Sequence, residues 1–216
     1  GSGDSYRFRA SLYEKLAPGL GTAVSGYYTR AGGFFENLAT GRKCDWERFG
    51  GGRWRTQWRN GKGLRLDNSL SFSVLEQGGY PYAYAGEEIV RDGQTVIRPG
   101  EIRYNDPSGY RRTTLSDGLT LRYDAAAFSV SSITSYQYSD DAMTLDQDFL
   151  PLSYFTLRQA RTEHALTEDL VFRSRDDRSY RWLFGVFGFY RHATMSAPVV
   201  FKQTGIEELI LANANA

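Results

Sequence analysis

The segment "AAFSVSSITSYQYSDD", residues 125–140, carries the pattern on which the fold prediction depends. Its even-numbered side chains have rings near both ends and smaller groups between them: Phe128, Val130, Ser132, Thr134, Tyr136 and Tyr138. Its odd-numbered side chains are almost all hydroxyl or amide groups: Ser129, Ser131, Ile133, Ser135 and Gln137. Because successive side chains of a strand point to opposite faces, the segment predicts a strand with one polar, hydrated face and one face that carries aromatic rings near both ends.

The spacing of the rings fits the apolar band of a membrane-spanning strand. From Phe128 to Tyr138 at roughly 3.3 Å per residue, with a tilt near 40°, the strand covers roughly 25 Å of the membrane normal. The rings then lie at the two lipid–water interfaces, and the hydroxyl face lines a water-filled interior. A soluble β-sandwich or lipocalin-like barrel also alternates, so a soluble β fold stays open at this point.

The same alternation recurs along the chain and predicts an all-β fold: an antiparallel up-and-down meander of about eight long strands, part of a transmembrane β-barrel. The expected strands are 4–16, 20–30, 49–60, 64–76, 109–124, 127–140, 159–175 and 180–194. Short turns at 17–21, 60–63, 124–127 and 176–179 alternate with long segments at 31–49, 77–109 and 140–158. Because antiparallel neighbours reverse direction at each connection, the long segments should share one end of the sheet.

Composition agrees with a strand-rich single domain over residues 1–216. Aromatic residues make up 15% of the chain and favour strands. No run of 18 apolar residues is present, which excludes a transmembrane helix.

A net charge of +1 points to no acidic partner such as nucleic acid. The single cysteine, Cys44, excludes an internal disulfide. The first residues, "GSGDSYRFRA", show no signal-peptide pattern.

The two faces of the predicted strands carry different chemistry. The lipid-facing, convex side should carry large rings: Trp54, Trp58, Phe128, Tyr136, Trp182 and Tyr190. The opposite, lumen-facing side should carry basic residues: Arg7, Arg9, Arg53, Arg55, Arg59 and Arg65. These could pair with acidic groups of a domain inside the barrel, guide an anionic solute, or form ladders with Asp67 and Glu14.

Two acidic residues do not fit the lipid-facing side. Glu168 and Asp117 share the parity of apolar neighbours, and a charge in mid-membrane is costly. A β-bulge beside either residue would switch the parity. Alternatively, the strand projects above the bilayer at that point.

The long segments carry the candidate ligand-binding residues, since loops often carry function. Tyr80 and Tyr82, in "EQGGYPYAYAG", suit stacking on a sugar or siderophore. Asp146, Asp148 and Tyr154 are the candidates in the third long segment. Together with Asp140 and Asp141, the aspartates could hold calcium, but the glycine and spacing of an EF-hand are missing, which favours a solvated loop.

Catalytic, metal and cofactor motifs are missing from the sequence. His164 and His192 are its only histidines, and neither lies in a triad or zinc pattern. No phosphate-binding glycine fingerprint is present. We therefore expect no enzymatic activity, no metal and no cofactor.

Four segments, in their order and spacing, resemble the barrel of TonB-dependent outer-membrane receptors in the style of Bacteroidetes sequences: "SSITSYQ" (131–137), "DQDFLPLSYFTLRQ" (146–159), "TEDLVFRS" (167–174) and "RWLFGVFGFY" (181–190). "GYYTRAGGFFENLATGRK" (26–43) is similar to the hairpin that follows the plug. The resemblance covers nearly the whole chain. Each motif alone is mostly strand pattern.

The resemblance implies a barrel of about 22 strands with a plug inside, in the outer membrane of a Gram-negative bacterium. Such receptors take up scarce, bulky solutes such as siderophores, cobalamin or glycans, and an inner-membrane TonB complex supplies the energy. This chain departs from that pattern. It has eight candidate strands, and its sequence shows neither a plug nor the segment through which the TonB complex transmits energy. A helical tail, "GIEELILANANA" (205–216), stands where a closing strand would be expected. We therefore expect a barrel fragment lacking the plug.

Two other functions stay open at this point. The chain could be a complete small eight-stranded outer-membrane barrel with a structural or adhesion role. Pairing of its first and eighth strands would support that alternative, and two free edges would count against it. It could also be a soluble β-rich carbohydrate-binding module. An outer-membrane lipase ranks below both.

Overall fold

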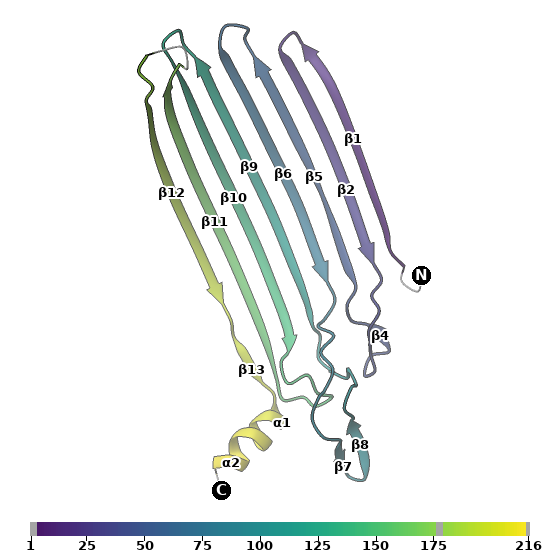
Figure 1. The fold of residues 1–216 in the computed structure, drawn as a ribbon. Coiled ribbons are helices and arrows are strands. Elements are labelled where there is room, and N and C mark those ends of the chain that lie inside the picture. Colours follow the sequence, from purple (N-terminus) through teal and green to yellow (C-terminus); the bar gives the residue numbers. More distant parts are fainter. Residues whose placement is uncertain (1–3, 176–178, 215–216) are drawn as a thin grey trace.

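A computed structural model describes residues 4–175 and 179–214. Eight long strands form one antiparallel sheet in which each strand pairs with the next long strand along the chain (Figure 1). They are β1 (Tyr6–Ala17), β2 (Leu20–Ala31), β5 (Glu47–Arg59), β6 (Leu64–Gln77), β9 (Gly109–Asp124), β10 (Phe128–Asp146), β11 (Phe155–Ser174) and β12 (Leu183–Ser196). The predicted antiparallel meander is confirmed.

Strands β10 and β11 are longer than the alternation pattern indicated. They comprise 19 and 20 residues, so the connection expected over 140–158 is reduced to residues 147–154. Strand β10 continues through Asp140 and Asp141, because the carboxylate of each lies beside a polar side chain of a neighbouring strand. Thr162 Oγ1 donates to Asp140 Oδ2 at 2.9 Å, and Arg112 Nε lies 4.0 Å from Asp141 Oδ2. Since the two carboxylates point to opposite faces of the sheet, the idea of one calcium-binding loop for them is wrong.

Short elements fill the other long connections. Strands β3 (Glu36–Asn37) and β4 (Arg42–Lys43) form one hairpin, and β7 (Ile89–Arg91) and β8 (Gln94–Ile97) form a second. Strand β13 (Val199–Phe201) pairs with the start of β11. A tail helix follows, made of α1 (Gln203–Gly205), η1 (Ile206–Leu211) and α2 (Ala212–Ala214).

The tail helix agrees with the helix expected over 205–216 for the residues that are described. Residues 215 and 216 lie outside them. Within the described part of the chain, no helix has the length and apolar character needed to cross a membrane.

The connections divide between the two ends of the sheet as predicted. Three short turns, the end of β11 and the start of β12 lie at one end. Of the fourth expected turn, 176–179, residues 176–178 lie outside the described residues. Both small hairpins, the 147–154 segment and the tail helix lie at the other end, called here the loop end (Figure 1). The order of strands alone produces this separation, because each antiparallel step reverses the chain.

The pairing register sorts the side chains into two faces. Trp54 pairs with Val24 and Leu70, and Tyr136 pairs with Leu166, which in turn pairs with Tyr190. Trp58 is an even number of residues from Trp54 on β5, and Phe128 is an even number from Tyr136 on β10, so both rings belong to this side. Trp182 precedes β12 and is an even number of residues from Tyr190. We call this side the aromatic face.

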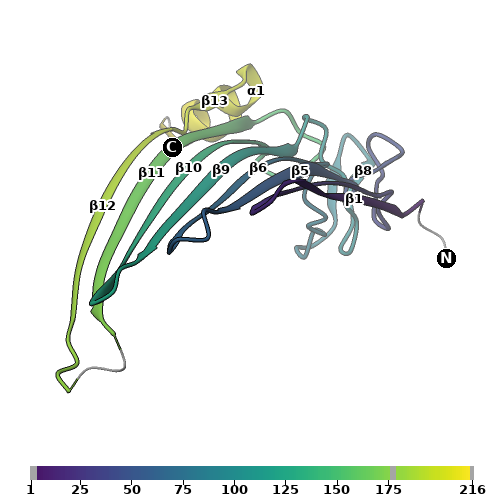
Figure 2. The same cartoon turned by 90° about the horizontal axis from the view of Figure 1, so that it is seen from above.

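The aromatic face is uncovered in the described structure. Trp54 is 53% exposed and Tyr190 is 61% exposed. The sheet curves like part of a cylinder wall, with no second sheet packed against it among the described residues (Figure 2). The rings are therefore not the interior of a β-sandwich.

Glu168 and Asp117 keep their positions on the aromatic face, which rules out the alternative of a β-bulge beside them. Pairing runs without a shift through β9, β10 and β11. Short polar side chains satisfy both carboxylates instead. Ser132 and Thr134 donate their hydroxyls to Glu168, and Asn68 Nδ2 donates to Asp117 Oδ1 at 2.9 Å. Hydrogen bonding of this kind lowers the cost of a polar group in apolar surroundings.

The sheet has two free edges. Over the described residues, β1 pairs only with β2, and β12 pairs only with β11. The first and eighth long strands do not meet, and they lie at opposite ends of the curve (Figure 2). This counts against the alternative of a complete eight-stranded barrel, because closure removes the edges of a barrel.

Candidate functional site at the loop end

The small buried core of the molecule lies in the loops and not in the sheet. Cys44, Ile102 and Tyr104 form a cluster that joins the 31–46 connection to the 78–108 connection. Asn37 Nδ2 donates to the Tyr104 carbonyl oxygen at 2.8 Å, and Leu38 N donates to the Ile102 carbonyl oxygen at 2.8 Å. Burial raises the pKa of the Tyr104 hydroxyl and of the Cys44 thiol, so both stay protonated at neutral pH. The two loops therefore form one packed unit.

Asp146, at the end of β10, attaches this unit to the sheet. Its side chain is fully buried. Asp146 Oδ2 accepts hydrogen bonds from the backbone N–H groups of Asn105 at 3.0 Å and Asp106 at 2.8 Å. The backbone N–H of Asp146 donates to Ser108 Oγ at 2.9 Å. One carboxyl group thus fixes residues 105–108 against the long-strand sheet.

The surroundings of the second oxygen of Asp146 favour protonation. Asp146 Oδ1 is buried and receives no donor from the described residues. Asp148 is its neighbour, and accepts backbone N–H groups from Leu150 at 2.8 Å and Tyr154 at 3.3 Å. Burial, and then the nearby negative charge of Asp148, raise the pKa of Asp146 to about 7, and burial raises that of Asp148 as well. We infer that a proton held between the two carboxyl groups would satisfy the buried oxygen.

The tail helix is fastened across the same loops by charged contacts. Arg91 binds Glu208 through two parallel hydrogen bonds, Nη1 to Oε1 at 2.9 Å and Nη2 to Oε2 at 2.7 Å. Tyr154 donates its hydroxyl to Glu208 Oε2 at 2.8 Å. Hydrogen bonds from Arg91 and Tyr154 lower the pKa of Glu208. Lys202 forms an ion pair with Asp106 at the start of the helix.

An aromatic cluster lies at the surface of the loop end. The rings of Tyr80 and Tyr82 stack with centroids 6.0 Å apart, and Phe149 meets Tyr82 edge-on at 5.1 Å. Tyr82 is 60% exposed, whereas Tyr80 and Phe149 are half-buried. Offset and edge-on pairs of this kind are favourable and leave ring surface free to stack on a ligand.

The structure separates the five candidate contact residues into two groups. Tyr80 and Tyr82 lie in the aromatic cluster. Asp146 is fully buried, Tyr154 is 8% exposed, and Asp148 is half-buried. These three therefore support the loops in this conformation, and their role in contacting a solute stays a prediction.

Phe149 is a residue that sequence reasoning missed. Its backbone adopts φ of 55°, which is uncommon for a residue other than glycine. This conformation follows the tight turn at Asp148 and brings the ring beside Tyr82, which is far away in the sequence. The phenylalanine in "DQDFLPL" was the available signal, but nothing in the sequence showed which neighbour its ring would meet.

The six predicted arginines lie together on the face opposite the rings. Pairing places Arg53 against Ser25 and Ser71, Arg55 against Ala23 and Ser69, and Arg59 against Arg65. Arg7 and Arg9 occupy the same side of β1. We call this side the arginine face.

Among the described residues, arginine ladders with Asp67 and Glu14 do not form. Glu14 pairs with Thr22 and lies on the aromatic face, whereas Asp67 accepts a hydrogen bond from Gln57. Arg65 instead lies 3.7 Å from Asp124. That ladder prediction is wrong, because Glu14 is an even-numbered residue of β1 and so points to the face opposite Arg7 and Arg9.

The arginine face is the more strongly hollowed side of the sheet. Hollows of about 710, 450 and 390 Å³ lie over it, and their linings include Arg122, Arg55 and Arg9 respectively. A smaller hollow of about 330 Å³ lies on the aromatic face beside His164. The sheet itself is a curved wall (Figure 2), and its larger hollows lie over the face that carries the arginines.

Metal ligands do not gather at the loop end. Over residues 4–175 and 179–214, no group of three or more histidine, cysteine, aspartate or glutamate side chains is arranged to hold a metal ion.

Comparisons with known proteins identify one similar fold. No protein-family model matches the chain, and no curated protein sequence matches it. The fold is similar to that in the crystal structure of the ferric yersiniabactin uptake receptor FyuA from Yersinia pestis, with a TM-score of 0.72 and 17% sequence identity. The similarity covers 92% of this chain and 30% of that receptor. The chain therefore has the fold of part of a receptor barrel and spans less than a third of that receptor's length.

Proposed function

We propose that this chain forms part of the barrel wall of a TonB-dependent receptor that takes up a scarce, bulky solute through the outer membrane of a Gram-negative bacterium. One observation carries the proposal: a curved meander with an exposed aromatic face, similar in fold over 92% of its length to an uptake receptor. The free edges of β1 and β12 would pair with further strands. The concave face would then enclose a lumen in which a plug domain and the TonB complex act.

The loop end is the side where the solute would arrive. All three long connections gather there, and they are packed into one unit by the buried contacts of Asp146 and Tyr104. A packed loop unit holds the aromatic cluster in a fixed position. Preorganised rings bind with a smaller loss of conformational entropy than mobile ones. A siderophore, cobalamin or glycan would all present surface on which these rings can stack.

The membrane part of the proposal can be tested with tryptophan fluorescence. In vesicles containing brominated lipids, a single-tryptophan variant that keeps Trp54 or Trp58 should be strongly quenched, because both rings lie on the aromatic face. A variant that keeps only Trp46, which precedes β5 at the loop end, should be quenched much less. Equal quenching of all three, or a monodisperse chain that needs no detergent, would contradict a membrane-embedded wall and favour the soluble β-rich binding module.

The solute part of the proposal can be tested at the aromatic cluster. Tyr82→Ala in the receptor should weaken solute binding by roughly 1–3 kcal/mol, the range of an interface anchor. Phe149→Ala should weaken it as well, because Phe149 holds the Tyr82 ring edge-on. Tyr123→Ala, on the aromatic face far from the loop end, is the matched control. Unchanged affinity in the Tyr82 variant, with the barrel still folded, would leave these rings a packing role only.

A further inference from the structure

The middle of the arginine face has an unusual composition. Three adjacent rows of paired residues cross it from β1 to β10, beginning at Arg9, Ser11 and Tyr13. Followed through the register to Ser139, Gln137 and Ser135, these rows contain no aspartate or glutamate. Serine is the commonest residue in them, and Arg9, Arg53 and Arg55 supply the only charges. We call this surface the arginine–serine floor.

The positive charge of the floor is not balanced within the described part of the chain. Arg9, Arg53 and Arg55 are exposed, and none of them forms an ion pair with a described residue. Elsewhere on the same face, several arginines are compensated by carboxylates. Arg122 lies 3.1 Å from Asp124, and Arg191 lies 2.7 Å from Glu163. The floor is therefore a region of fixed cations that no carboxylate of the described residues balances.

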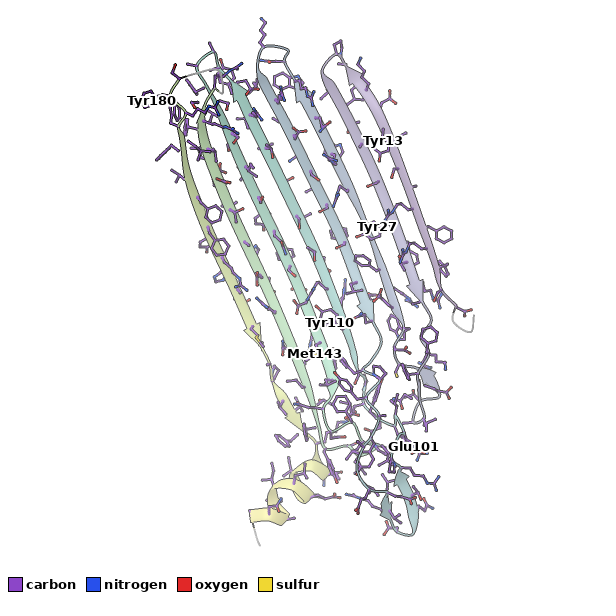
Figure 3. All side chains as sticks on the ribbon, in the orientation of Figure 1. Tyr13, Tyr27, Glu101, Tyr110, Met143 and Tyr180 are labelled. Carbon is purple, nitrogen blue, oxygen red and sulfur yellow. The ribbon has the colours of Figure 1, made fainter. Side chains whose placement is uncertain are left out.

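Two hollows form a continuous groove over the floor. One, of about 390 Å³, is lined by Arg9 and Arg53 together with Tyr13, Tyr27 and several serines. The next, of about 450 Å³, shares Tyr13, Ser25 and Arg53 with the first and extends to Arg55. Tyr13 and Tyr27 lie on neighbouring strands, closer to the short-turn end and to the loop end respectively (Figure 3). The groove therefore runs along the strands.

The floor suits a hydrated solute better than a packed protein surface. Apart from the rings of Tyr13 and Tyr27, the residues between the arginines are small or polar, with serine the commonest, and offer little apolar area for a dry contact. The opposite edge of the same face differs, because β12 places Leu183, Phe187 and Phe189 on it, each more than half exposed. A guanidinium group only donates hydrogen bonds and matches a carboxylate or phosphate with two parallel bonds. Serine hydroxyls add further donors for oxygen atoms.

We propose that the arginine–serine floor binds a small, oxygen-rich anion bearing carboxylate or phosphate groups. This inference rests on the proposed function, and narrows the transported solute to an anionic one. Arg53 and Arg55 are two residues apart on one strand, so their charges are separated by roughly 7 Å along it. A solute with several anionic groups can therefore contact both, with Arg9 completing the site from β1.

Calorimetric titration of the full chain in detergent tests the proposal with citrate as the anionic probe and maltotriose as a neutral one. Citrate should bind and maltotriose should not. Replacing both arginines, Arg53→Gln with Arg55→Gln, should weaken citrate binding at least tenfold. The double lysine replacement at the same positions should retain more affinity, because the charge remains. Arg48→Gln, on the same strand but on the aromatic face, should change binding less than twofold.

Several outcomes would overturn the anion site. They are no citrate binding by the wild-type chain, equal binding of maltotriose, or equal losses in the Arg48 variant and the double variant. A lower thermal stability of the double glutamine variant with citrate affinity unchanged would instead assign the arginines to packing. The tryptophan-quenching experiment separates the two proposals. A chain that inserts as a barrel wall but binds no anion keeps the receptor function and loses only the anionic solute.

Discussion

Replacing Asp146 by alanine should release the loop unit from the sheet. The variant leaves the buried N–H groups of Asn105 and Asp106 without an acceptor. Each unsatisfied buried donor costs about 1–3 kcal/mol, so the local free energy of opening should fall by about 3 kcal/mol. Amide hydrogen exchange at residues 105–108 measures this directly. Protection there should drop while the amides in the middle of β10 keep theirs.

Asp146→Asn is the matched control and also tests the shared proton. The amide carbonyl can still accept the two backbone N–H groups, and its NH₂ group can donate to Asp148 without a proton between them. Protection should therefore stay close to that of the wild type at neutral pH. A loss as large as in the alanine variant would show that the negative charge of Asp146, and not hydrogen-bond geometry, holds the loop.

The pKa of Asp146 sets the direction of the pH dependence. Its folded value of about 7 lies above the ordinary value near 4, so the folded loop holds the proton more tightly than the unfolded chain. The stability that the proton contributes is fully present below about pH 4 and is lost as the pH rises through about 7. Protection factors of residues 105–108 should therefore be higher at pH 5 than at pH 8.5. Asp146→Asn should abolish most of that difference, whereas a reversed slope would contradict the shared proton.

Gly51→Ala should destabilise the sheet itself. A methyl group there would overlap the backbone carbonyl oxygen of Phe72 and would lie 2.9 Å from the Tyr27 hydroxyl and 3.0 Å from Ser73 Cα. Tyr27 can rotate away, but Phe72 and Ser73 belong to the backbone of β6 and can move only with that strand. Overpacking of this kind costs roughly 1–3 kcal/mol, and we expect the upper part of that range. Thermal unfolding in detergent measures it.

Gly118→Ala on β9 provides the comparison for Gly51. Gly118 lies on the same face, but no heavy atom comes within 4 Å of an added methyl group. Because glycine in a strand costs roughly 0.5–1 kcal/mol relative to alanine, this variant should be neutral or slightly stabilising. Equal destabilisation by both substitutions would mean that strand flexibility, and not the close approach of β5 to β6, requires glycine.

The aromatic cluster shows where prediction from sequence stopped. Tyr80 and Tyr82 could be singled out, because rings in a loop with proline and glycine are visible in the sequence. Phe149 could not, because its contact with Tyr82 depends on how two separate loops fold onto each other. The burial of Asp146 could not be predicted either. A carboxylate at the end of a strand is usually solvated, and here a loop from about 40 residues earlier covers it.

The strands, their order and the two faces of the sheet could be predicted from the sequence, although β10 and β11 are longer than expected. Alternation with a period of two is a local property, so it places the rings and the arginines on opposite faces. The lengths of the connections indicate which strand ends lie together. Contacts between residues far apart in the sequence could not be predicted in this way. Arg91 meets Glu208 across 117 positions and Tyr154 across 63. Glu168 stays on the aromatic face because Ser132 and Thr134 of the neighbouring strand satisfy it. The free energy of each such contact depends on two segments that no local pattern brings together.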